Sequence, residues 1–140
     1  MAEIEAILAT LLEETGASRA TLRSALTGDT FAVTHEALAP RARSLREERT
    51  VDLRTQPVVQ EVRQLRQVVQ HDCRTAYDDP AFQRMLDVYG GLAAQIVTPI
   101  VRDGRLAAIL SLHQLGSPRR WTDDEVAAAT RAAARIAELL

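Results

Sequence analysis

The dipeptide Asp103-Gly104 lies between two aliphatic runs, Gln95 to Val101 and Leu106 to Gln114. An Asp-Gly pair favours a type I′ turn, which needs a positive φ at both central residues, and aliphatic runs on both sides make it a strong hairpin signal. The two runs are therefore predicted to be paired antiparallel strands.

A two-residue loop at this turn predicts a register for the hairpin. It places Val101 opposite Leu106, and the further predicted pairs are Val97 with Leu110 and Gln95 with Leu112. One face then carries Gln95, Val97, Leu112 and Gln114, and the other carries Thr98, Ile109, Ser111 and His113. Because both faces are largely apolar, we expect the hairpin in the middle of a sheet that is covered on both sides. Pro99 cannot donate a ladder hydrogen bond, so a bulged or unpaired position is expected there.

The last helix is predicted to begin after Thr122. Thr122 and Glu125 have capping-box spacing, and Trp121 and Val126 have the spacing of a hydrophobic staple. The helix carries one stripe of mostly small residues: Val126, Ala129, Ala133, Ile136 and Leu140. This stripe permits a close approach to another helix, and the first helix offers a matching one.

That first helix is predicted from Met1 to about Glu14. Its apolar residues recur at helical spacing: Ile4, Ile7, Leu8, Leu11 and Leu12. Gly16 is a plausible C-terminal cap. Two strands are then predicted, Ala20 to Leu26 and Phe31 to Leu38, joined by a turn at Thr27-Gly28-Asp29.

The middle of the chain is more polar. Ala39 to Gln56 is predicted to be a solvated loop with a helical turn, followed by a helix from Pro57 to about Arg66. Val68 and Val69 begin a short strand that feeds the polar loop His71-Asp72-Cys73. Asp78-Asp79-Pro80 is typical of a helix start, and Gly90-Gly91 ends that helix.

Length and composition restrict the class of protein. A chain of 140 residues, 46% hydrophobic and 26% charged, fits a single globular domain over residues 1–140. A net charge of -2 gives no electrostatic footprint for nucleic acid or an anionic membrane. One cysteine excludes an internal disulfide, and no secretory signal or apolar run of about 20 residues is visible, so we expect a cytoplasmic protein. All basic residues are Arg, which indicates a GC-rich bacterial genome.

Three reactive residue types meet at His71-Asp72-Cys73. As a metal site the group is weak, because only His71 and Cys73 could converge on an extended chain, with His113 as a possible further ligand. As a nucleophile, Cys73 would need His71 or His113 to lower its thiol pKa. The plainer interpretation is a polar loop in which Asp72 caps backbone amides.

The order of elements resembles a GAF domain across nearly the whole chain. The segment from Thr98 to Glu125 is similar to the family's terminal hairpin and helix start, and Val68 to Cys73 resembles its central strand. The resemblance implies an α+β fold in which the terminal helices pack on one face of an antiparallel sheet. A small-molecule pocket then lies on the other face.

The resemblance also carries expectations about ligands and partners. Family members bind cyclic nucleotides, haem, bilins, amino acids or aromatic metabolites, and many form homodimers through the terminal helices. The Cys-His pair of bilin-attaching members is missing, since Arg74 follows Cys73. One cysteine also cannot run the disulfide exchange of the free methionine sulfoxide reductases with this fold. No particular cofactor or metal is predicted.

The leading hypothesis is a non-catalytic, dimeric, small-molecule-binding sensory domain. The alternatives are a small GAF-fold enzyme that uses Cys73 with His71 or His113, with or without a metal, and a structural dimerisation module with a filled pocket. The segment Tyr77 to Tyr89 is predicted to cover the pocket or to be core, and either His113 or Gln114 must face the pocket. The predicted ligand-binding residues are His71, Asp72, Cys73, Tyr77, Phe82, Met85, Tyr89, Gln95, Val97, Leu112, His113 and Gln114.

Overall fold

The computed structural model describes residues 2–140. Its helices are α1 (Ala2–Thr15), α2 (Pro57–Arg63), α3 (Pro80–Val88), α4 (Asp123–Ala137) and the short 3-10 helix η1 (Cys73–Thr75). Its strands are β1 (Arg19–Arg23), β2 (His35–Leu38), β3 (Val68–Gln70), β4 (Leu92–Arg102) and β5 (Arg105–Leu115).

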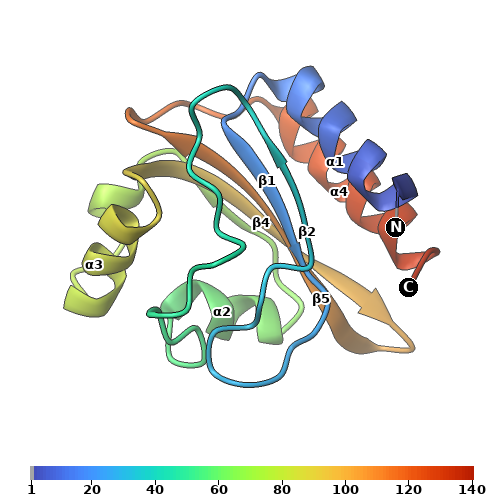
Figure 1. The fold of residues 1–140 in the computed structure, drawn as a ribbon, viewed down its shortest axis with the longest axis horizontal. Helices are drawn as coiled ribbons and strands as arrows, with labels where there is room; N and C mark the ends of the chain where they lie inside the picture. Colours follow the sequence, from blue (N-terminus) through green and yellow to red (C-terminus); the bar gives the residue numbers. More distant parts are fainter. Residues whose placement is uncertain (1) are drawn as a thin grey trace.

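The five strands form one antiparallel sheet in the order β2-β1-β5-β4-β3. The long β4–β5 hairpin occupies the interior of the sheet, as its two apolar faces predicted. Figure 1 shows α1 and α4 side by side on one face, with α2 and α3 on the other. The predicted α+β architecture is confirmed.

The hairpin turn is as predicted, but the register beyond it is not. Asp103 and Gly104 have φ values of 53° and 74°, and Val101 pairs with Leu106. Ile100 then pairs with Ala108, which leaves Ala107 as an extra residue on β5. This bulge lies near Pro99, where an irregularity was expected.

The bulge corrects the predicted pairs by one residue. Val97 pairs with Ser111 and Gln95 with His113, in place of Leu110 and Leu112. As a result, the odd-numbered residues of both strands share a face between the two ends of the hairpin. A second irregularity, at Ala93, lies at the far end of β4.

The terminal helices build a core on the first face of the sheet. Ile4, Leu8 and Leu11 of α1 and Ile136 of α4 are almost fully buried against Ile96 and other apolar residues of the strands. The stripe of α4 therefore packs within the chain, against the sheet and α1. Its close approach to α1 is allowed by the small side chains Ala129 and Ala133.

Local signals fixed the helix ends well. Gly16 has a φ of 66° directly after α1, and its N–H donates to the carbonyl of Leu12 over 2.8 Å. The Asp79 carboxylate accepts from the first backbone amides of α3. Thr122 and Glu125 form the predicted capping box of α4. These bonds satisfy groups that every helix end leaves without an intrahelical partner.

The early strands are shorter than predicted. β1 and β2 pair as expected, but residues 24–34 connect them, because Phe31 adopts a φ of 45° and turns into the second core with only 2% of its surface exposed. Residues 39–56 contain turns but no helix, and they place Leu45 and Leu53 in that same core. α2 ends at Arg63, before the predicted Arg66, and Leu65 beyond it has a φ of 63°.

The loop before α4 ties three parts of the fold together. The Arg119 guanidinium donates to the carbonyl of Thr15 at the end of α1, pairs with Glu125 and lies 4.4 Å from the centre of the Trp121 ring. The backbone N–H of Trp121 donates to Nδ1 of His71, just beyond β3, over 3.0 Å. We call Arg119, Trp121 and His71 the clasp.

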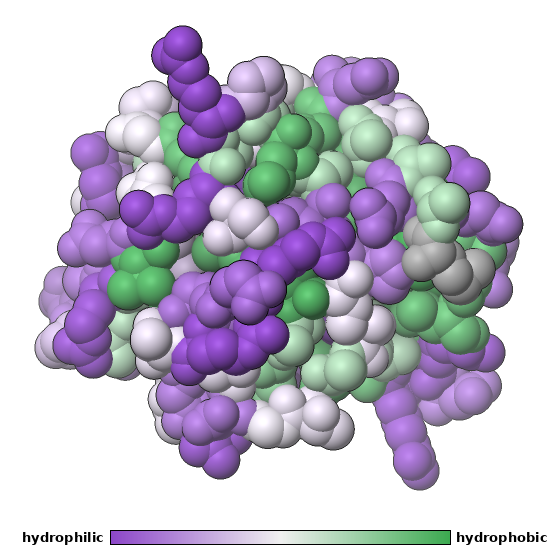
Figure 2. All heavy atoms as spheres, in the orientation of Figure 1, coloured by the Kyte–Doolittle hydropathy of each residue, from purple (hydrophilic) through white to green (hydrophobic). Residues whose placement is uncertain are grey.

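The outer surface carries no large apolar face in the view of Figure 2, where hydrophobic atoms form separate patches among hydrophilic ones. None of the helices within residues 2–140 is both long and apolar enough to cross a bilayer.

Candidate functional site

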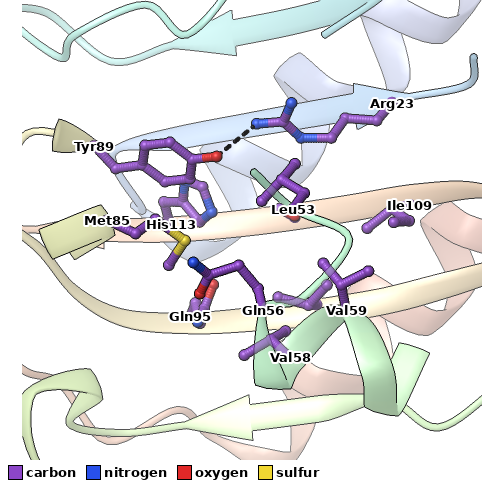
Figure 3. Close-up of a pocket in the computed structure, with 12 residues that line it drawn as sticks. Arg23, Leu53, Gln56, Val58, Val59, Met85, Tyr89, Gln95, Ile109 and His113 are labelled. Atoms are coloured by element: carbon purple, nitrogen blue, oxygen red, sulfur yellow. Dashed lines mark hydrogen bonds between the residues drawn. The ribbon is translucent and has the colours of Figure 1, made fainter. Parts of the chain in front are cut away.

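A cavity of about 40 Å³ lies between the second face of the sheet and the α2 and α3 side of the molecule (Figure 3). Six polar residues line it: Arg23, Gln56, Tyr89, Gln95, Ser111 and His113. Six apolar residues complete the wall: Leu53, Val58, Val59, Met85, Val97 and Ile109. The lining thus combines an apolar body with several convergent polar groups, which is typical of small-molecule sites.

A polar row crosses four strands of the sheet, and its two middle residues, His113 and Gln95, line the cavity. Arg19 of β1 is beside His113 of β5, which is beside Gln95 of β4, which is beside Gln70 of β3. The Gln95 side-chain amide donates to Gln70 over 2.8 Å. Arg19, although fully buried, is held by bonds to the carbonyl oxygens of Arg43 (2.7 Å) and Tyr89 (2.9 Å). Buried polar groups of this kind fix one arrangement because each needs its partner.

His113 is held as a neutral ring with a defined tautomer. Nε and Nη2 of Arg19 both donate to Nδ1 of His113, over 3.0 and 2.8 Å, so Nδ1 carries the lone pair and the ring proton is on Nε2. Burial, and then the charges of Arg19 and Arg23, lower the pKa of His113 well below its ordinary value. Nε2–H makes no hydrogen bond to any of residues 2–140, and the ring lines the cavity.

Arg23 and Tyr89 form the opposite polar corner. Nη1 of Arg23 donates to the carbonyls of Thr30 (3.0 Å) and Phe31 (2.6 Å), and Nη2 donates to the Tyr89 hydroxyl over 3.2 Å. The dashed line in Figure 3 marks this last bond. Because the Tyr89 oxygen is the acceptor, its own proton remains available to the cavity. Burial raises the pKa of Tyr89, so that the hydroxyl stays protonated.

Gln56 and Ser111 supply further polar atoms. Oε1 of Gln56 is fully enclosed and accepts no hydrogen bond from the described residues, although the side chain borders the cavity. The Ser111 hydroxyl likewise has no partner within residues 2–140. Such unsatisfied groups are costly when buried, and they mark a place where water or a ligand completes the bonding.

Five of the predicted ligand-binding residues line this cavity: Met85, Tyr89, Gln95, Val97 and His113. Leu112 lies in the helix-side core, and the Gln114 amide oxygen accepts from Arg119 over 3.1 Å. The bulge at Ala107 separates these two from Gln95 and Val97, with which the predicted register had grouped them.

The other predicted residues lie outside the cavity. His71 belongs to the clasp, and Asp72 caps η1 by accepting from the Arg74 N–H, which is the plainer interpretation of that loop. Cys73 is fully buried in the second core, where burial and then the Asp72 charge raise its thiol pKa to about 12. Tyr77 packs edge-on against buried Phe82, with ring centres 4.9 Å apart. Within residues 2–140 no group of three His, Cys, Asp or Glu side chains is placed to bind a metal.

Seven lining residues were not among the predicted ones: Arg23, Leu53, Gln56, Val58, Val59, Ile109 and Ser111. Ile109 and Ser111 already shared a face with His113 in the predicted register, but the sequence did not tell which face meets the cavity. Arg23 had a usable signal, because Arg19, Thr21 and Arg23 alternate with apolar Ala20 and Leu22. A polar face on a strand ordinarily indicates solvent, and here it faces the cavity side.

The chemistry available at neutral pH is recognition by hydrogen-bond donors. Neutral His113 presents an N–H rather than a lone pair, and the Tyr89 hydroxyl is protonated. The Cys73 thiol is also protonated and does not line the cavity. No nucleophile with an adjacent base is therefore formed by the cavity residues.

Comparison with known proteins was made by sequence and by structure. No curated protein matches the sequence. The blue-light absorbing form of the PixJ GAF domain of Thermosynechococcus elongatus is 22% identical, covers 99% of this chain and 84% of its own, and has a TM-score of 0.77. The photoproduct state of GAF3 from Slr1393 of Synechocystis sp. PCC6803 is 18% identical, with coverages of 97% and 89% and a TM-score of 0.80.

A third similar structure is the chromophore-binding domain of a Stigmatella aurantiaca bacteriophytochrome. It is 17% identical, with coverages of 97% and 52% and a TM-score of 0.71. These likenesses concern the fold. The family model described as GAF domain matches residues 2–140, and this chain therefore belongs to the GAF domain family.

Proposed function

We propose that this chain is a non-catalytic sensory domain that binds a small molecule in the cavity between the sheet and the α2 and α3 side. The observation that carries the proposal is the convergence of polar side chains on that cavity: His113, Ser111 and Gln56 line it, and Oε1 of Gln56 is enclosed without a hydrogen-bond partner among residues 2–140. A cavity that served packing alone would be apolar or filled. The sensory role agrees with similar structures that are cyanobacteriochrome and bacteriophytochrome domains.

Absence of catalysis is part of the proposal. Its support is the protonation of the candidate groups at neutral pH: the thiol of Cys73 has a pKa of about 12, and His113 offers only a donor. A thiol must lose its proton to act as a nucleophile. The GAF-fold enzyme alternative has no such group in position.

We further propose that the ligand is not a covalently attached tetrapyrrole. The chain's one cysteine is buried in the second core and is followed by Arg74. At about 10–15 Å³ of probe volume for each water-sized group, a cavity of about 40 Å³ takes only a few such groups, whereas sites for larger ligands occupy about 300–1,000 Å³. The ligand is therefore compact. A lone free cysteine also suits work in the reducing cytoplasm.

The proposed signal leaves through the clasp. The polar row ends at Gln70 of β3, whose carbonyl accepts from the Trp121 indole N–H over 3.1 Å. From Trp121 and Arg119 the bonds continue to Glu125 of α4 and to the carbonyl of Thr15 in α1. A shift of Gln95 on ligand binding thus has a bonded route to both terminal helices.

The binding test is a thermal-denaturation screen of the intact chain against compact metabolites. A compound present at 100 times its Kd adds about 2.7 kcal/mol to the free energy of unfolding. In the variant Ser111→Val, two methyl groups replace the hydroxyl at the cavity, so the shift should disappear. The matched control is Ser117→Val in the exposed loop before α4, which should keep it. A shift that survives Ser111→Val would place the ligand elsewhere and end the proposal.

We also propose a homodimer through the outer surfaces of α1 and α4. The groove between these helices carries Ala6 and Thr10 together with opposite charges at Glu3 and Arg135, so that two copies related by a two-fold axis could pair them. Sedimentation equilibrium should show a dimer for the parent chain and a monomer for Ala6→Arg. A monomeric parent chain at high concentration would refute the interface.

A further inference from the structure

Two arginine side chains are buried on the cavity face of β1 without a carboxylate in contact. Arg19 is 0% exposed and Arg23 is 6% exposed. None of the ion pairs formed within residues 2–140 includes either one. Arg19 remains protonated at neutral pH, because its pKa is lowered by burial only to about 10. The region beside the cavity therefore holds two positive charges.

The nearest carboxylates are engaged elsewhere. Glu36 attracts Arg19 only from a distance, and its oxygens accept from the Ser44 hydroxyl (2.5 Å) and the Leu45 N–H (2.8 Å). Glu48 is likewise within electrostatic range of Arg23, but it bonds to Thr50 and to the Val51 N–H in its own loop. Buried charge without a direct counter-charge is expensive to maintain, which indicates that something else completes it.

The hydrogen-bond inventory of the cavity points the same way. Three lining groups offer a donor that has no acceptor among residues 2–140: the Tyr89 hydroxyl, Nε2–H of His113 and the Ser111 hydroxyl. The amide of Gln56 can turn to present either its oxygen or its N–H₂ group. A species rich in acceptors and negative in charge fits this surplus of donors.

We infer that the cavity binds a compact monocarboxylate, with its carboxylate at Arg23 and Tyr89 and its short apolar end against Leu53, Val59 and Ile109. The inference rests on the proposed function, because it concerns the same site. Figure 3 shows the Arg23–Tyr89 corner with Leu53 beside it and Ile109 and Val59 farther along the cavity. A carboxylate matches the guanidinium and hydroxyl donors through charge-assisted hydrogen bonds.

The small volume and the apolar wall separate this ligand from other anions. About 40 Å³ accommodates a group of few heavy atoms, and aromatic acids are too large for it. The aliphatic wall of Leu53, Val59 and Ile109 favours an anion with a methyl or ethyl end over a fully hydrated inorganic oxyanion. Acetate and propionate are therefore expected to bind more tightly than nitrate or phosphate.

The experiment measures binding of acetate, propionate, nitrate, phosphate, acetamide and propionamide to the intact chain by NMR titration at constant ionic strength. We expect the acids to shift the resonances of residues around the cavity in a saturable manner, and the uncharged amides to bind about 10-fold more weakly or worse. Equal affinity for acid and amide would overturn the inference while leaving the proposed small-molecule site intact. Tighter binding of nitrate or phosphate than of propionate would also overturn it.

Two tyrosine variants locate the charge recognition. Tyr89→Phe keeps the ring and removes only the hydroxyl that Arg23 orients, and it should weaken propionate binding by about 10-fold. Tyr77→Phe removes a hydroxyl outside the cavity and should leave it unchanged. Unaltered binding in Tyr89→Phe would overturn the inference. If, in addition, no compound of the thermal-denaturation screen binds the parent chain, the proposed function fails as well, and this outcome distinguishes the two failures.

Discussion

Replacement of Arg19 by Met is the sharpest test of how this fold holds its polar interior. Met has a similar length and no charge, so the change removes the guanidinium but keeps most of the buried volume. Three acceptors lose their donor: Nδ1 of His113 and the carbonyls of Arg43 and Tyr89. The bonds to these acceptors are 2.7 to 3.0 Å long, and those to His113 and Tyr89 lie in the buried interior.

The magnitude follows from two opposing terms. Each enclosed acceptor without a donor costs about 1–3 kcal/mol, so three cost about 3–9 kcal/mol. Removing the buried charge returns several kcal/mol of desolvation free energy. We therefore expect Arg19→Met to lower the free energy of unfolding by about 2–5 kcal/mol, a large part of the ~5–15 kcal/mol typical of a domain.

Urea denaturation followed by circular dichroism measures this difference directly, because a chain of this length is expected to unfold in a single transition. Arg131→Met on the exposed face of α4 is the matched control and should change stability by less than about 0.5 kcal/mol. Arg19→Lys should be intermediate, since one ammonium cannot reach all three acceptors. A loss below about 1 kcal/mol for Arg19→Met would refute the claim that these bonds organise the interior.

Three further outcomes are expected. Since the folded state keeps His113 neutral and the unfolded state binds a proton near pH 6.5, stability should fall by up to about 1.4 kcal/mol per pH unit as pH drops below that value; His113→Gln should lose this component in acid denaturation curves, and an unchanged slope would contradict it. The Cys73 thiol, with its pKa raised from 9.0 to about 12, should react with a thiol reagent about 1,000-fold more slowly in the folded chain than in urea at pH 8, and comparable rates would show that it is accessible. Thr122→Ala should destabilise the chain by about 1 kcal/mol through loss of the α4 cap, and urea denaturation that detects no loss would count against the capping box.

Features written in a few neighbouring residues could be predicted from the sequence. The turn at Asp103-Gly104, the caps at Asp79 and Thr122 and the end of α1 at Gly16 all depend on contacts within one turn of chain. Their physics is local, because a backbone amide near a helix start finds its acceptor two or three residues away. The order of elements followed from these signals.

The cavity lining depended on information that is not local. Ala107 is one aliphatic residue among several, and nothing beside it in the sequence marks it as the extra residue of a bulge. Arg19 and Arg23 were missed because burial of an arginine is decided by partners outside its own strand, such as the carbonyls of Arg43 and Phe31. Residues 39–56 were predicted to be solvated because charged residues dominate the segment. Leu45 and Leu53 stand singly among them and pack into the second core in the fold.

The extra residue at Ala107 decides which side chains of β5 share a face with Gln95 of β4. A strand has a period of two, so one residue added or removed reverses the side to which everything beyond it points. If Ala107 paired with Ile100 in a ladder without a bulge, Leu112 would lie opposite Gln95. Leu112 and Gln114 would then face the cavity, and Ser111 and His113 would face the terminal helices. The groups offered to a ligand therefore depend on the strand register as well as on the identity of the residues. A single-codon deletion at Ala107 would therefore remove the bulge and keep His113 opposite Gln95, with the turn, the helix caps and the order of strands untouched.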